Sequence, residues 1–196
     1  MQIKAARFVT SADSVASCPE SEVPEFAFIG RSNVGKSSLL NMLCRKGEIS
    51  RVSKTPGRTQ LINFFVVNDH WSLVDLPGYG FVKSSKQARD AFEELIAGYF
   101  LERDSLTCAF VLIDSRHTPQ KIDLEFTAWL VENNVPFVIV FTKADKVKAT
   151  QLKKHTALFL EAMEEFCDEL PRTFVTSSKK SAGRTDVLNF IEQCLG

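Results

Sequence analysis

An apolar run that leads into a glycine-rich loop and then a helix limits the possible folds of this chain more than any other feature. Phe26–Ile29 are all apolar, and Gly30–Ser37 (GRSNVGKS) match the pattern GxxxxGK[ST]. Residues Lys36–Cys44 then have helical spacing. The N–H groups of such a loop and the N-terminus of the helix form a cradle for phosphate. The motif therefore predicts a strand, a phosphate-binding loop and a helix in succession.

Two side chains carry the chemistry of this motif. The ammonium group of Lys36 is expected to bridge the β- and γ-phosphates of a nucleotide, and the hydroxyl of Ser37 is expected to bind Mg²⁺. A chance match in a glycine turn is the alternative, but the strand and helix signals on either side argue against it. We therefore expect nucleotide binding with Mg²⁺.

The rest of the chain alternates short apolar runs with amphipathic stretches. Since runs such as FVLID and FVIVF are apolar at successive positions, we expect strands that are covered on both faces. The alternation predicts an α/β three-layer sandwich with a mostly parallel six-stranded sheet, and a hairpin at Asn68–His70 supplies one antiparallel edge strand. The predicted strands are Phe26–Ile29, Leu61–Val67, Trp71–Asp75, Cys108–Asp114, Pro136–Phe141 and Arg172–Thr176. The predicted helices are Lys36–Cys44, Lys86–Leu101, Gln120–Glu132, Thr150–Cys167 and Arg184–Leu195.

Composition sets the outer bounds of the molecule. Residues 1–24 are predicted to be an N-terminal segment and loop, because residues 11–25 are rich in Ser, Pro and Glu, and residues 25–196 are predicted to be one domain. The 24 basic and 24 acidic residues exclude a protein coated in positive charge, but leave room for a local basic patch. Five widely spaced cysteines without a CxxC pair indicate a reducing compartment. No apolar run approaches the roughly 20 residues of a membrane span, so we expect a cytoplasmic protein.

Further polar signals lie on either side of the predicted hairpin. The strand Trp71–Asp75 continues into Leu76, Pro77 and Gly78 (DLPG), where the aspartate can hold Mg²⁺ through water and the glycine N–H can contact the γ-phosphate. A threonine in the preceding segment SKTPGRTQ can reach Mg²⁺ only while the γ-phosphate is present. Between its two threonines we choose Thr59 rather than Thr55, because Thr59 is nearer the next strand. An ordinary solvated loop is the alternative.

Polar residues after the last two strands predict a pocket for guanine. The sequence Thr142-Lys143-Ala144-Asp145 follows one strand, and Thr176-Ser177-Ser178 follows the other. The Asp145 carboxylate can accept both donors of guanine, whereas adenine offers none there, and such a site discriminates by about 10⁴–10⁵. The stem of Lys143 is expected to cover the base, and the N–H of Ser178 to donate to guanine O6. The TKAD motif alone is also compatible with a solvated helix start, but its place after DLPG favours the pocket.

In this order, GRSNVGKS, PGRT, DLPG, TKAD and TSSK resemble the motifs of the Ras-like, translation-factor class of P-loop GTPases. More narrowly, GRSNVGKSSLLN, KTPGRTQLINFF, VDLPGYGF and LIDSRHTPQKIDLE resemble the EngB (YihA/YsxC) family of bacterial ribosome-assembly GTPases, from about residue 26 to the C-terminus. The resemblance implies GTP and GDP binding with Mg²⁺ and a role in assembling the large ribosomal subunit, through rRNA and ribosomal protein. It also implies a need in normal cell division and septation.

The resemblance also implies a set of site residues. Mg²⁺ is expected on Ser37 and Thr59, and on Asp75 through water, while Lys36, Thr59 and Gly78 are the expected catalytic residues. The expected nucleotide contacts are Gly30, Arg31, Ser32, Asn33, Val34, Gly35, Lys36, Ser37, Gly57, Arg58, Thr59, Gln60, Leu61, Asp75, Leu76, Pro77, Gly78, Thr142, Lys143, Ala144, Asp145, Thr176, Ser177 and Ser178.

Three residues set the details of the expected activity. Thr142 stands where most GTPases have an asparagine that braces the pocket, and a hydroxyl makes fewer hydrogen bonds, so we expect micromolar affinity. Tyr79 stands where Ras-type proteins carry the glutamine that orients the attacking water, so hydrolysis should be slow and depend on K⁺ or a partner. Asn33 resembles the asparagine that helps to hold K⁺ in potassium-activated GTPases. A turn-forming role for Asn33 is equally open.

Other functions compete with a GTPase switch. A P-loop small-molecule kinase or metabolic NTPase would share the phosphate loop, but the TKAD and TSSK pair argues against it. A Ras-type trafficking adaptor would need a lipid anchor, and the end of the chain, QCLG, lacks the CaaX spacing. For a ribosomal partner, the basic segment Arg45–Arg58 is a candidate surface for RNA phosphate, and a solvated loop is the alternative. We expect a monomer without membrane contact.

Overall fold

Strands and helices alternate through most of the computed structural model, which describes residues 1–45, 61–80 and 86–196. Short 3₁₀ turns lie at Val15–Ser17 and Ala144–Lys146. The strands are β1 (Ala6–Ala12), β2 (Glu25–Gly30), β3 (Ile62–Val67), β4 (Trp71–Asp75), β5 (Leu106–Asp114), β6 (Phe137–Thr142) and β7 (Thr173–Val175). The helices are α1 (Lys36–Cys44), α2 (Lys86–Glu102), α3 (Lys121–Glu132), α4 (Ala149–Met163) and α5 (Arg184–Leu195).

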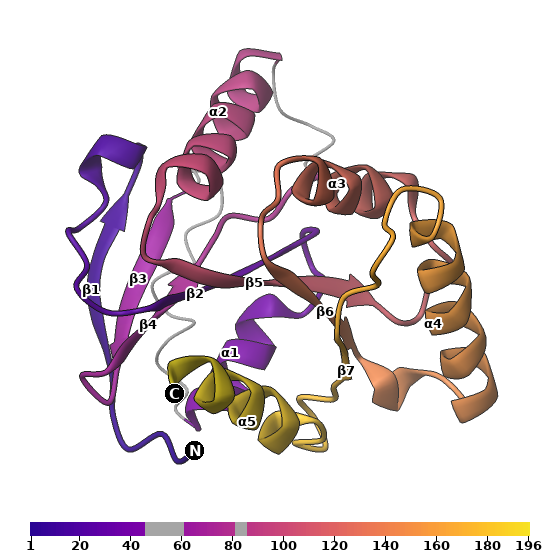
Figure 1. Ribbon diagram of the computed structural model, residues 1–196. Helices are drawn as coiled ribbons and strands as arrows, with labels where there is room; N and C mark the ends of the chain where they lie inside the picture. The colour runs from indigo at the N-terminus through magenta and orange to yellow at the C-terminus, as the bar shows by residue number, and fades with distance from the viewer. Residues whose placement is uncertain (46–60, 81–85) are drawn as a thin grey trace.

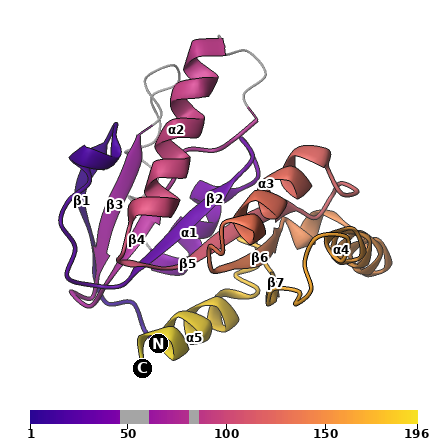
Figure 2. The ribbon, with the colours of Figure 1, turned by 45° about the horizontal axis from the view of Figure 1, so that its top comes forward.

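The strands form one sheet in the order β1-β3-β4-β2-β5-β6-β7. Strands β4, β2, β5, β6 and β7 are parallel, whereas β3 is antiparallel to both of its neighbours. Helices α1 and α5 cover one face, and α2, α3 and α4 cover the other (Figures 1 and 2). This arrangement confirms the predicted α/β sandwich of three layers.

The predicted number of six strands is wrong, because the described residues contain a seventh, β1. It pairs with β3 from Ala6 opposite Val67 to Ala12 opposite Ile62, so the antiparallel strand β3 is not at the edge. The sequence gives little sign of β1, since its two largest apolar side chains, Phe8 and Val9, are each 41% exposed. Pairing with β3, rather than an apolar face, fixes this strand.

The helix boundaries agree with the predicted ones to within one residue in four of the five helices. The exception is α4, which ends at Met163 and not at Cys167. Glu164 and Glu165 follow Met163, and negative charge interacts unfavourably with the C-terminal end of a helix. The predicted apolar face of this helix therefore extends further along the sequence than the helix itself.

Parallel pairing brings the carboxyl ends of the strands to one edge of the sheet. Phe28 pairs with Asp75, and Gly30 pairs with Leu112. On the other side of β5, Asp114 pairs with Thr142. Because ligands in open α/β sheets bind outside these strand ends, the loops that follow β2, β4, β5, β6 and β7 are the place to look for a site.

Candidate functional site

The loop between β2 and α1 turns tightly enough to point its backbone N–H groups inward. Asn33 has φ 65° and Gly35 has φ 106°, both in the left-handed region, where asparagine and glycine are the residues that fit most easily. The N–H of Val34 donates to the carbonyl of Arg31 at 3.1 Å, and the Val34 side chain is buried. The turn-forming interpretation of Asn33 is thereby supported, while K⁺ binding by its side chain stays a prediction.

The segment after β4 lies directly against this loop. A Cβ on Gly78 would lie 2.8 Å from the carbonyl oxygen of Gly30, so no larger residue fits without a shift of the backbone. The N–H of Ser32 donates to the carbonyl of Tyr79 at 3.3 Å. The structure therefore brings the predicted glycine of DLPG into contact with the phosphate loop.

Two charged groups of the predicted site form an ion pair. Lys36, the first residue of α1, donates through its ammonium group to the carboxylate of Asp75, the last residue of β4. Ser37 is the next residue of α1. The described residues contain no group of three or more His, Cys, Asp or Glu that could hold a metal. A hydroxyl and one carboxylate next to a phosphate cradle fit Mg²⁺, which keeps several waters and binds phosphate oxygens.

The hydroxyl of Thr142 braces the phosphate loop from β6. Its Oγ1 lies 2.7 Å from the carbonyl oxygen of Val34 and 3.2 Å from that of Ile113. Thr142 thus contacts the phosphate loop from the position at which most GTPases have an asparagine. The single hydroxyl proton limits the strength of this contact, as predicted from chemistry alone.

Lys143 lies across the mouth of the loop. Its ammonium group donates to the carbonyl of Asn33 at 2.5 Å and to Asp114 at 2.8 Å. Its stem lies so close to Gly35 that a Cβ on this glycine would be 3.5 Å from Lys143 Cε. Burial alone would raise the pKa of Asp114, but hydrogen bonds from Arg116 and Lys143 outweigh burial and hold that pKa well below its usual range. Sequence reasoning missed Asp114, although it ends a strand just as Asp75 does.

The predicted base pocket is assembled from two loops. The hydroxyl of Ser177 donates to the Asp145 carboxylate at 2.6 Å, and the N–H of Ala144 donates to the carbonyl of Thr176 at 3.1 Å. The hydrogen bond from Ser177 also lowers the pKa of Asp145. Asp145 is therefore ionised near neutral pH and has a fixed orientation. A groove of about 540 Å³ lies between α1 with its C-cap, from Ser38 to Arg45, and the turn that contains Ser178, and Asp145 is not among the residues that line it.

The segment SKTPGRTQ, which contains the threonine predicted to reach Mg²⁺, lies outside the described residues. Gly57, Arg58, Thr59 and Gln60 lie outside the described residues, as do Thr55 and most of the basic segment Arg45–Arg58. Leu61 directly precedes β3, and Asn63 of β3 pairs with Asp75. This register puts Leu61 at the edge of the sheet where the phosphate loop lies.

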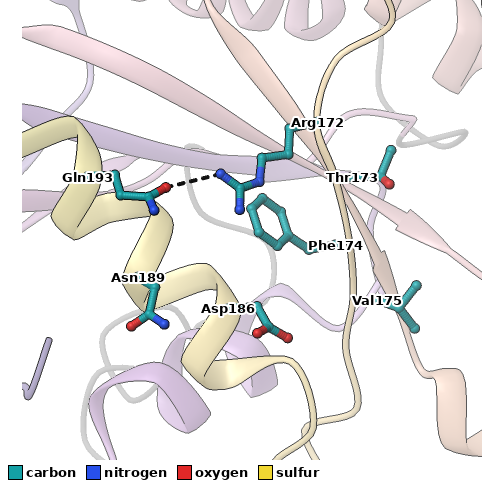
Figure 3. A pocket seen from close by; sticks show the side chains of 7 residues that line it. All are labelled: Arg172, Thr173, Phe174, Val175, Asp186, Asn189 and Gln193. Carbon is teal, nitrogen blue, oxygen red and sulfur yellow. Dashed lines mark hydrogen bonds between the residues drawn. The ribbon is translucent and has the colours of Figure 1, made fainter.

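A separate hollow of about 390 Å³ lies between β7 and α5 (Figure 3). The guanidinium of Arg172 crosses it, 5.4 Å from the ring centre of Phe174, and donates to Gln193 at 3.1 Å. None of the predicted site residues lines this hollow. Arg172 and Gln193 are engaged with each other, and the predicted site residues that the structure describes lie instead at the strand ends, which are therefore the better candidate site.

The known proteins that this chain resembles are GTP-binding proteins. Residues 25–143 match the family of 50S ribosome-binding GTPases. A probable GTP-binding protein EngB of Christiangramia forsetii is 52% identical over 98% of this chain and 97% of that protein. One of Bacteroides fragilis is also 52% identical, over 98% of this chain and 96% of that protein. The crystal structure of a probable GTP-binding protein EngB superposes with a TM-score of 0.71 at 24% identity, covering 87% of this chain and 98% of that one, which shows the fold alone. In the described part of the chain, no helix is long and apolar enough to cross a membrane.

Replacing Thr142 with valine tests the brace on the phosphate loop. Thr142→Val keeps the shape of the side chain but leaves the Val34 carbonyl without its donor, which should cost about 1–3 kcal/mol of folding free energy. Guanine nucleotide affinity should fall about tenfold, because the loop that holds the phosphates is released. Denaturant titration and isothermal calorimetry measure the two effects.

Thr156→Val is the matched control, because the Thr156 hydroxyl bonds only to carbonyls of its own helix, those of Leu152 and Lys153. It should change stability by less than about 0.5 kcal/mol and leave affinity unchanged. Equal affinities in the two variants would mean that the Thr142 contact does not support the loop.

Proposed function

The chain belongs to the EngB family of GTP-binding proteins, and on that premise we propose that it is a slow GTPase that switches conformation during assembly of the large ribosomal subunit. GTP and GDP are its ligands. Guanine nucleotide with Mg²⁺ is held at the carboxyl ends of β2, β4, β6 and β7. The protein acts as a cytoplasmic monomer and is needed for normal cell division and septation.

The observation that carries this proposal is the position of Asp145. Its carboxylate is held by the hydroxyl of Ser177, and Lys143, two residues earlier in the chain, extends its stem over Gly35 of the phosphate loop. A carboxylate oriented in this way has two acceptor oxygens for the N1–H and the amino group of guanine. The side chain of Lys143 reaches from the TKAD motif, which contains Asp145, to the carbonyl of Asn33 in the phosphate loop. The predicted sites for the base and for the phosphates are therefore adjacent.

The charged groups at the phosphate loop, Lys36 and Asp75, have the remaining roles in binding phosphate and metal. The ion pair between Lys36 and Asp75 opens when nucleotide binds, so that Lys36 bridges the β- and γ-phosphates. Ser37 and Thr59 would hold Mg²⁺ directly, and Asp75 would hold it through water. When bound, the metal ion neutralises charge that develops on the phosphate oxygens. Gly78 donates its N–H to the terminal phosphate, which makes the loop sensitive to hydrolysis.

Base specificity is tested by Asp145→Asn. The amide replaces an acceptor by a donor, so GTP binding should fall by several orders of magnitude. Xanthosine triphosphate, which has a carbonyl in place of the amino group, should bind in its stead. Competition against a fluorescent nucleotide measures both affinities. If GTP affinity stayed at the wild-type level, the base pocket would lie elsewhere.

Ribosomal partnership is tested by sedimentation with 30S and 50S subunits. The protein should pellet with 50S subunits in the presence of a non-hydrolysable GTP analogue and remain in the supernatant with GDP, because the γ-phosphate orders the switch segments. Lys36→Ala, which cannot hold the triphosphate, is the control and should remain in the supernatant in both cases. Equal binding to 30S and 50S, or to neither, would refute the ribosomal part of the proposal.

Turnover should be slow, because Tyr79 offers no group to orient water. Ras-type intrinsic hydrolysis is only about 10⁻⁴ s⁻¹ even with its glutamine, and an added positive charge is worth about 10³–10⁵. The isolated protein should therefore turn over GTP in minutes to hours. Replacing Na⁺ with K⁺ should raise the rate if Asn33 helps to hold the ion.

Asn33→Gly is the variant for this experiment, since glycine adopts the φ of 65° without strain and alanine does not. A K⁺ effect that disappears in Asn33→Gly supports cation binding. A K⁺ effect of the same size in both proteins would exclude the Asn33 side chain as a ligand. Fast hydrolysis by the wild-type protein in Na⁺ would contradict the proposed mechanism.

A further inference from the structure

The side chain of Tyr79 packs against α3. Its hydroxyl donates to Asp123 Oδ1 at 2.9 Å, and its ring stacks on Phe126 with 4.7 Å between the ring centres. Only 6% of the residue is exposed. Burial, and then the charge of Asp123, raise the pKa of Tyr79 well above its usual value, so the hydroxyl keeps its proton and donates at all physiological pH values. The hydrogen bond to Asp123 and the stacking on Phe126 together attach the segment after β4 to α3, and we call this pair of contacts the anchor.

Asp123 connects two segments of the site to α3. The carboxylate accepts the hydroxyl of Tyr79 and also the Nε–H of Arg31, which lies 3.0 Å away. Arg31 is the second residue of the phosphate loop, and Asp123 lies in the first turn of α3. Only 1% of Asp123 is exposed, and a buried carboxylate is stable only while its donors are in place. The carboxylate therefore holds the start of the phosphate loop and the residue after DLPG at fixed positions.

Contacts of the adjacent residue and of the phosphate loop constrain the backbone of Gly78. Its neighbour Tyr79 is held by its side chain from one direction and, through its carbonyl, by the N–H of Ser32 from the other. Gly78 itself touches the carbonyl of Gly30 so closely that a Cβ would not fit. A shift of the Tyr79 ring is thus transmitted to the backbone of Gly78.

We propose that Tyr79 and Asp123 are positioning residues that set the backbone of Gly78 for the terminal phosphate and so raise the affinity for GTP relative to that for GDP. The inference rests on the proposed function of the site. GDP has no γ-phosphate to contact Gly78, and Arg31 keeps its hydrogen bond to Asp123 when only the Tyr79 hydroxyl is removed, so loss of that hydroxyl weakens GTP binding and leaves GDP binding unchanged. Tyr79 acts through Gly78 and touches no reacting atom.

The chain contains a second cluster of the same chemistry, which serves as a matched control. Tyr99 of α2 donates its hydroxyl to Glu25 Oε2 at 3.0 Å, and Arg103 donates to the same carboxylate at 2.6 and 3.1 Å. Glu25 is fully buried and begins β2, whereas the phosphate loop follows the other end of that strand. Tyr79 and Tyr99 are the two tyrosines of the chain. Each therefore offers a buried hydroxyl on a paired carboxylate, but only one lies beside Gly78.

The experiment compares Tyr79→Phe with Tyr99→Phe in the full chain with Mg²⁺. Each variant loses one buried hydrogen bond to a carboxylate and should show a similar fall in the melting temperature without nucleotide. Calorimetry with GDP and with a non-hydrolysable GTP analogue then gives two dissociation constants for each protein. In Tyr79→Phe the affinity for the analogue should fall about five- to tenfold while that for GDP is unchanged. In Tyr99→Phe both should match the wild type.

Asp123→Asn, which keeps the size of the side chain, distinguishes an effect of the hydrogen bond from Tyr79 from an effect of packing. Asp123→Asn keeps an acceptor oxygen for the Tyr79 hydroxyl and should reduce the affinity for the GTP analogue less than Tyr79→Phe does. An unchanged ratio of the two affinities in Tyr79→Phe would overturn the inference. An increased preference for the GTP analogue would also overturn it, since the anchor would then hold Gly78 away from the phosphate. If the wild-type protein bound neither nucleotide, the proposed function itself would fail, which the wild-type measurement shows first.

Discussion

The backbone of Gly78 passes the carbonyl of Gly30 so closely that a Cβ there would lie 2.8 Å from the oxygen. Strands β2 and β4 end side by side at this point, and their parallel register leaves no room between the two loops that follow them. Lys36 and Asp75 meet for the same reason, since Asp75 ends β4 and Lys36 begins α1 after the loop that follows β2. The geometry of the phosphate site therefore depends on this backbone contact, and the side chains are arranged around it.

Buried carboxylates fix the surrounding segments to the sheet. Asp123 joins α3 to the phosphate loop and to Tyr79, and Glu25 joins β2 to α2 through Tyr99 and Arg103. A carboxylate out of water is costly unless its hydrogen bonds are made, so each cluster favours one arrangement of its segments over all others. The two clusters use the same chemistry with different results. The cluster of Glu25 stabilises the fold at the start of β2, and the cluster of Asp123 joins the phosphate loop to the segment that follows β4.

Much of the fold could be predicted from local patterns. Helices α1 and α5 and strand β4 have the predicted boundaries, because apolar periodicity and the flanking polar residues are both properties of neighbouring residues. Strand β1 could not be predicted, because its exposed Phe8 and Val9 show no buried face and its position depends on pairing with β3, about fifty residues away in the sequence. The early end of α4 depends on charge at its C-terminus, which the spacing of apolar residues does not report.

The sequence by itself determined which chemical groups follow each strand: the phosphate loop, DLPG, TKAD and TSSK, in an order that resembles one family of GTPases. It also predicted slow hydrolysis, because Tyr79 stands where Ras-type proteins carry the glutamine that orients water. Only the tertiary structure decided what Tyr79 does instead, since its partners Asp123 and Phe126 lie more than forty residues away. The same holds for the contact of Thr142 with Val34. Spacing along the chain specifies the residues, but the register of parallel strands specifies which of them touch.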